Sequence, residues 1–189
     1  MAISPAPARP LPLIRLGLLV VTVPLIALAI TWTYLGMRAV MDIGGACASG
    51  GPYVPVQPCP AGADVMLSVG IPLLILASLA ASGVALTLGA PTLLLPMWVG
   101  LFGSLGWNFL EYAFEFDESG IVVGWLVCGV VFELMALPAL ALIVLADTVH
   151  VPGVGGGRAH GPRWRWWLFY AAAGAAGIWL GLSSFRAWT

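Results

Sequence analysis

The sequence has no lysine and few charged residues of any kind. Arginine is the basic residue used throughout, and charged side chains make up 8% of the 189 residues, against about 25% in a soluble domain. The formal net charge of -1 gives no reason to expect nucleic-acid binding. The missing lysine also excludes a phosphate-binding P-loop in the glycine-rich segment 148–165, because that motif needs a lysine.

Apolar residues dominate what remains. They account for 61% of the chain, and the mean hydropathy is +1.03. A helix needs about 20 apolar residues to cross a bilayer core. Five windows meet this requirement: 13–35, 65–88, 92–114, 121–145 and 166–185. The sequence therefore predicts an all-α, polytopic transmembrane helix bundle of about five spans.

We expect one membrane domain, residues 13–189, after a short cytoplasmic segment, residues 1–12. Gly89, Ala90 and Pro91 alone separate the second and third windows, which predicts a tight turn between antiparallel helices. The first window resembles a signal peptide around residues 27–29. Its apolar run continues beyond that triplet, so we expect an uncleaved helix.

Arginine placement predicts the orientation. With the N-terminus in the cytoplasm, five arginines face inward and two, Arg38 and Arg186, face outward. Cytoplasmic loops usually carry the excess of positive charge. We therefore expect the N-terminus inside the cell and residues 36–64 outside it.

The outer segment 36–64 is rich in glycine and proline and contains Cys47 and Cys59. A disulfide between them is expected outside a bacterial membrane and would stabilise the segment by roughly 2–3 kcal/mol. A structural bridge is the favoured interpretation. The alternative is a thiol–disulfide exchange pair, but redox cysteines usually lie closer together and beside an activating basic residue.

Two segments have distinctive sequences. They are MDIGGACASGGPY at 41–53, followed by CP at 59–60, and GWNFLEYAF at 106–114. Both resemble segments of a group of uncharacterised actinobacterial integral membrane proteins. The similarity covers residues 38–138 approximately. It implies a bacterial membrane location and a multi-pass topology, and it transfers no catalytic residue.

Asn108 and Glu111 lie in the third window, three residues apart on one helix face. Glu111 is about one turn from the outer interface, and either Arg38 or Arg186 could pair with it. A structural ion pair is one interpretation. A site where a ligand or ion enters the membrane is the other.

Glu133 lies deeper, roughly 18 Å into the fourth window. A charge at that depth costs at least about 2.5–3.5 kcal/mol. We therefore predict that Glu133 points into the bundle in its neutral form, with Ser78, Ser82 and Ser104 as candidate hydrogen-bond partners. It could fix helix packing or carry protons.

These features favour a non-enzymatic accessory or scaffolding subunit in the bacterial plasma membrane. Its expected partners are the lipid bilayer and another membrane protein or a second copy. The alternatives are a small proton-linked transporter or permeation pathway through Glu133 and Glu111, and a membrane thiol–disulfide oxidoreductase. Asp147, His150 and His160 are too few for a usual metal site, and no cofactor is expected.

Overall fold

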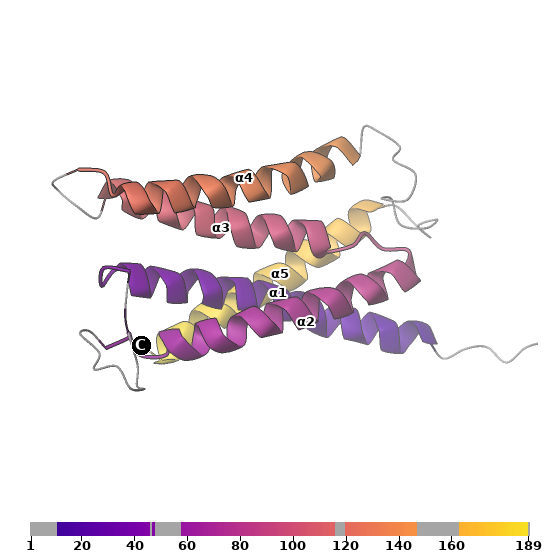
Figure 1. Ribbon diagram of the computed structural model, residues 1–189. Coiled ribbons are helices and arrows are strands. Elements are labelled where there is room, and N and C mark those ends of the chain that lie inside the picture. The colour runs from indigo at the N-terminus through magenta and orange to yellow at the C-terminus, as the bar shows by residue number, and fades with distance from the viewer. Residues whose placement is uncertain (1–10, 46, 48–57, 116–119, 147–162, 189) are drawn as a thin grey trace, which may run out of the picture.

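A computed structural model describes residues 11–45, 47, 58–115, 120–146 and 163–188, and in these residues the chain forms helices without strands. The helices are α1 (Leu11–Met41), α2 (Ala63–Leu88), α3 (Leu94–Glu115), α4 (Val123–Ala146) and α5 (Arg163–Trp188). Successive helices run in opposite directions along one bundle (Figure 1). The predicted all-α helix bundle is confirmed.

Four of these helices, α1, α2, α4 and α5, are long and apolar enough to cross a membrane. Large apolar side chains are exposed along them, among them Leu76 (67%), Leu134 (60%) and Trp179 (68%). Soluble monomers rarely expose so much apolar surface, which indicates a membrane protein. The exception among the described helices is α3, whose apolar run is interrupted by several glycines, Ser104, Asn108 and Glu111.

The helix α1 is longer than the window that predicts it. Residues 36–41, which we expected in the outer segment, form its last turns. The helix ends where Gly44 and Gly45 adopt positive φ angles of 97° and 82°, a conformation that glycine adopts without steric cost. This extension places Arg38 on a rigid helix instead of in a loop.

The predicted turn at 89–91 is present. Gly89 has a φ of 66° and caps α2, and the backbone N–H of Ala90 donates to the carbonyl of Ala85 at 2.9 Å. The Tyr170 hydroxyl on α5 donates to the Pro91 carbonyl at 2.8 Å. The turn between α2 and α3 is therefore held to α5 as well.

The bundle is built around α1. Among the described helices, α2, α3 and α5 all pack on α1, whereas α4 packs on α3 alone. The α3–α4 hairpin consequently forms a layer of its own beside α1, α2 and α5 (Figure 1). The buried core between α1 and α2 includes Leu19, Val23, Leu74 and Ala81.

Glycines bring α5 close to α1. A Cβ atom on Gly177 would lie 2.8 Å from the Ala27 side chain and nearer still to the Pro24 carbonyl oxygen, and one on Gly181 would lie 2.8 Å from Thr31. Such close contact is how helices pack in lipid. Gly177 and Gly181 thus allow the internal packing of α5 on α1.

Candidate functional site

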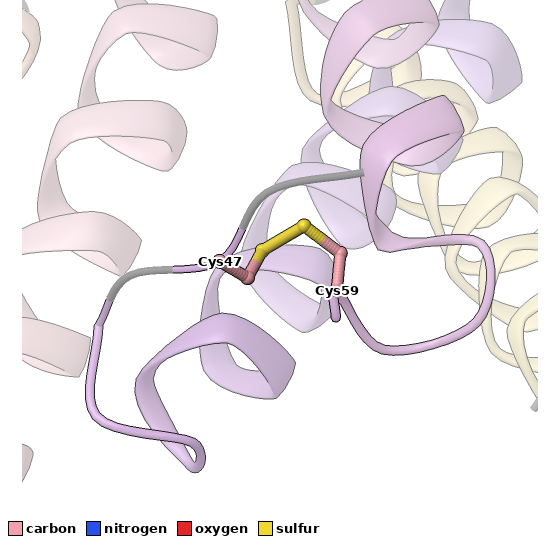
Figure 2. Close-up of a disulfide and its surroundings, with 2 residues drawn as sticks. All are labelled: Cys47 and Cys59. Carbon is pink, nitrogen blue, oxygen red and sulfur yellow. A yellow bond between two sulfur atoms is a disulfide. The ribbon is translucent and has the colours of Figure 1, made fainter. Parts of the chain in front are cut away.

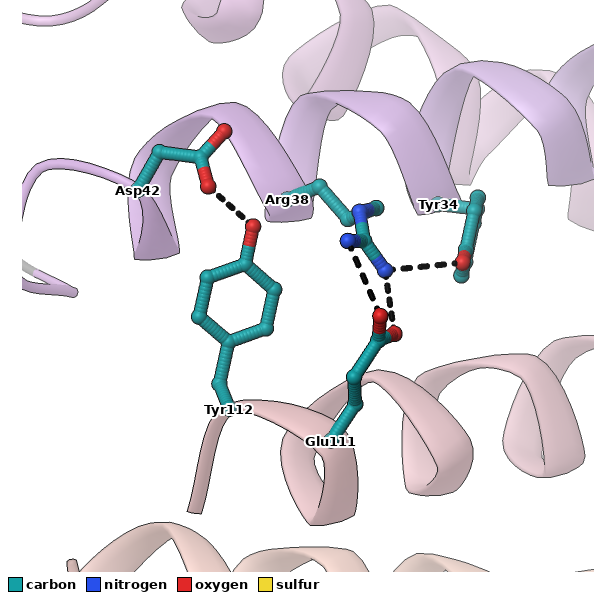
Figure 3. Close-up of polar contacts among 5 residues, drawn as sticks. All are labelled: Tyr34, Arg38, Asp42, Glu111 and Tyr112. Carbon is teal, nitrogen blue, oxygen red and sulfur yellow. Dashed lines mark hydrogen bonds and ion pairs between the residues drawn. The ribbon is translucent and has the colours of Figure 1, made fainter. Parts of the chain in front are cut away.

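Polar side chains gather at the end of the bundle where α1 and α3 finish and α2 and α4 begin, which we call the Arg38 end. Arg38 donates from both terminal nitrogens to the two carboxylate oxygens of Glu111. The Nη2–Oε1 distance is 3.2 Å. Nη1 also donates to the Tyr34 hydroxyl at 3.2 Å. Figure 3 shows this arrangement between α1 and α3.

A second polar contact lies beside the first. The Tyr112 hydroxyl on α3 donates to Asp42, just beyond the end of α1 (Figure 3). The Arg38 guanidinium carbon lies 5.0 Å from the centre of the Tyr112 ring, within the range of a cation–π contact. Trp125 of α4 packs edge-on against the same ring at 6.1 Å. The Arg38 end therefore joins three helices.

The ion pair is partly buried. Its two side chains are 30% and 24% exposed, and two parallel N–H···O bonds between arginine and carboxylate are among the strongest polar contacts in proteins. The structure thus pairs Glu111 with Arg38. The alternative candidate, Arg186, is exposed near the end of α5, and no ion pair involves it within the described part of the chain.

Cys47 and Cys59 form a disulfide at the same end, with a Cα–Cα distance of 4.8 Å (Figure 2). The bridge links the segment that leaves α1 to the segment that enters α2. Close to it, a Cβ atom on Gly45 would lie 3.1 Å from the Trp125 ring. The chain leaving α1 is therefore anchored both to α2, covalently, and to α4, by packing.

Asn108 is one turn below this cluster and is fully buried on α3. Neither its Nδ2 nor its Oδ1 atom has a hydrogen-bond partner among the described residues. An unsatisfied buried amide costs about 1–3 kcal/mol. Asn108 is therefore a destabilising residue within the chain itself.

Replacement of Asn108 by leucine, which has the same branched shape, should raise the stability of the isolated chain by about 1–3 kcal/mol, because it removes the desolvation cost. Unfolding of the purified protein in mild detergent measures the change. Asn108→Asp is the matched control and should lower stability, since it buries a charge. A loss of stability in Asn108→Leu would show that the amide has a partner after all.

Glu133 lies against α3. A Cβ atom on Gly106 would be 2.8 Å from its Oε1 atom and 2.9 Å from its Cγ atom, so the glycine makes room for the acid. Glu133 is half-buried, and no hydrogen bond involves it within the described helices. Along the chain it lies near the middle of α4.

The three serines that we expected to form hydrogen bonds with Glu133 do not do so among the described residues. Ser104 donates to the Leu101 carbonyl at 3.0 Å, and the hydroxyls of Ser78 and Ser82 are buried without a partner among the described residues. Ser78 and Ser82 are on α2, which α4 does not touch. The predicted contacts were wrong because hydropathy gives the depth of a residue and not the helix that it faces.

The described residues hold no group of three or more histidine, cysteine, aspartate or glutamate side chains that could bind a metal ion. Asp147, His150 and His160 lie outside the described residues. Three members of the polar cluster, Tyr34, Asp42 and Tyr112, were not predicted from the sequence. The four-residue spacings from Tyr34 to Arg38 and from Arg38 to Asp42 could have indicated the first two, because such residues share a helix face.

The chain matches no protein-family model, no curated protein and no solved structure.

Proposed function

We propose that the protein is a multi-pass protein of a bacterial plasma membrane, with its N-terminus in the cytoplasm and its Arg38 end outside. Four apolar helices of sufficient length support the membrane location. The excess of arginines near the start of α1 and α5 supports the orientation. On this proposal α3 also crosses the bilayer, shielded on one side by α4 and on the other by α1.

Its proposed role is that of a non-enzymatic accessory or scaffolding subunit that presents the Arg38 end to a partner protein. The pairing of reactive groups at this end carries the proposal. Glu111 is bound by Arg38, Asp42 by Tyr112, and Cys47 by Cys59. Groups satisfied in this way fix a shape, whereas a catalytic site keeps a nucleophile or a base available to substrate.

Site-specific photocrosslinking in native membranes tests this role. A photoreactive amino acid at Ala61, exposed between the disulfide and α2, should capture one discrete protein. The same probe at Leu76, on the exposed face of α2, is the control and should capture lipid. Replacing both Cys47 and Cys59 by serine should lower the yield of the Ala61 adduct. The bridge holds this segment in place and stabilises it by roughly 2–3 kcal/mol.

The second candidate, a proton-linked transporter, is favoured by one observation. Glu133 lies near mid-helix without a partner among the described residues, as an acid that binds and releases protons would. If the Ala61 probe captures nothing while the purified protein moves protons into vesicles, and Glu133→Gln abolishes that flux, the transporter replaces the accessory subunit. Cycling of the Cys47–Cys59 bridge with the redox state of the cell would instead indicate an oxidoreductase.

A further inference from the structure

A groove runs along α1 between α3 and α5. It consists of two cavities, of about 310 Å³ and about 470 Å³, that share Ala27 and Ile30 on α1. The larger cavity extends toward Tyr34 at the Arg38 end. The smaller one extends the other way, toward Tyr170. Together the two adjoining cavities follow much of the length of α1.

The arrangement of helices explains the groove. In the described part of the bundle, α3 and α5 each pack on α1 without packing on each other. Gly100 and Ser104 form the α3 wall of the larger cavity, and Ile178 and Leu182 form the α5 wall. The small residues on α3 leave space that larger side chains would fill.

The walls are apolar although hydroxyl groups are present. Thr31 donates to the Ala27 carbonyl at 2.8 Å, and Ser104 donates to the Leu101 carbonyl at 3.0 Å, so both hydroxyls are bound to their own helices. Tyr34 differs from them. Its hydroxyl accepts from Arg38, at the end of the groove that lies beside the ion pair.

The size of the groove limits what can fill it. A membrane-crossing helix occupies roughly 2,400 Å³ as a cylinder about 10 Å wide and 30 Å long, several times the larger cavity. Cavities of about 300–1,000 Å³ are typical of small-molecule sites. An elongated apolar groove that ends beside the Arg38 end therefore suits a single flexible hydrocarbon chain whose polar group lies at that end of the bundle.

We propose that this groove binds one hydrocarbon chain of a membrane lipid, with the ester groups of that lipid at the level of Tyr34. Tyr34 lies one turn below Arg38, about 6 Å along α1, which is the depth expected of the ester groups if Arg38 is at the headgroup level. The inference rests on the proposed membrane location and is independent of the proposed partner protein.

Lipid retention tests the proposal. The full-length protein is reconstituted in vesicles of phosphatidylethanolamine and phosphatidylglycerol, extracted into detergent and weighed by native mass spectrometry. The wild type should retain one lipid per chain. Gly100→Leu, whose side chain enters the groove beside Ile30, should retain at least about tenfold less. Ser104→Leu fills the same cavity from the next turn and should behave alike.

Gly83→Leu is the matched control. It makes the same change inside a helix, but the space around Gly83 is open, so it should retain lipid as the wild type does. An intact Cys47–Cys59 bridge and unchanged thermal unfolding show that each variant has folded. Equal lipid retention in all variants, or none in the wild type, would overturn the groove site. A dimer that Gly100→Leu dissociates would assign the groove to a second copy.

Flotation of the reconstituted vesicles separates this inference from the membrane location. Protein that floats with the vesicles but retains no lipid contradicts the groove alone. Protein that does not float contradicts the membrane location and the groove together.

Discussion

Gly177→Ala should separate α5 from α1 and lower the stability of the bundle by about 3 kcal/mol or more. The new methyl group would lie 2.8 Å from the Ala27 side chain and even closer to the Pro24 carbonyl oxygen. A backbone oxygen cannot rotate away as the end of a side chain can, so the whole helix must shift. Denaturation of the purified protein in mild detergent measures the loss.

Gly174→Ala provides the control for this effect. Gly174 lies one turn earlier on α5, and the space around it is open to 4 Å. The substitution should leave stability unchanged or raise it slightly, because alanine favours a helix more than glycine does. Equal effects of the two substitutions would contradict the close packing of α5 on α1.

Arg38→Met should lower stability by about 1.5–3 kcal/mol, the range for hydrogen bonds to charged groups. The substitution leaves the Glu111 carboxylate without its cation in a site where it is only 24% exposed. Adding Glu111→Met should recover much of the loss, because two apolar side chains often replace a shielded ion pair without cost. The double variant should thus be more stable than Arg38→Met alone.

Arg186→Met combined with Glu111→Met is the matched control. Arg186 is exposed on α5. The changes in the free energy of unfolding caused by Arg186→Met and by Glu111→Met should therefore add to within about 0.5 kcal/mol. Coupling between Arg186 and Glu111, with none between Arg38 and Glu111, would reverse the assignment of the ion pair.

The sequence was sufficient for the helices and for the turn at 89–91, because both depend on local composition. It could not choose between Arg38 and Arg186, since both lie near the expected outer surface. That choice depends on which helices touch: α3 packs on α1 and not on α5. The extension of α1 through Met41 was missed because a hydropathy window ends at the lipid boundary, whereas a helix continues beyond it.

For Glu133, too, the sequence indicated the position along its helix but not the helix that the side chain faces. Its place near the middle of α4 follows from the length of the apolar run. Its contact with Gly106 does not, because periodicity within one helix says nothing about the helix opposite. Ser78 and Ser82 were plausible partners by depth alone, and the arrangement of the layers put them out of reach.

The groove could not be anticipated from the sequence either. Gly100 and Ser104 are small residues one turn apart, and such a pair can let two helices approach, as Gly177 and Gly181 do. On α3 the same residue types line an open space. Small residues allow close packing but do not produce it. Whether another helix packs against them depends on the rest of the bundle.

The dependence of α4 on α3 bears on how the chain is made. During synthesis α3 leaves the ribosome before α4. It is the one described helix without an apolar stretch long enough to cross a membrane, and Asn108 and Glu111 lie in its second half. The translocation channel releases a segment sideways once the segment is sufficiently hydrophobic. We therefore expect α3 to wait in the channel until α4 has been synthesised, so that the hairpin enters the bilayer as a unit with Glu133 already resting on Gly106.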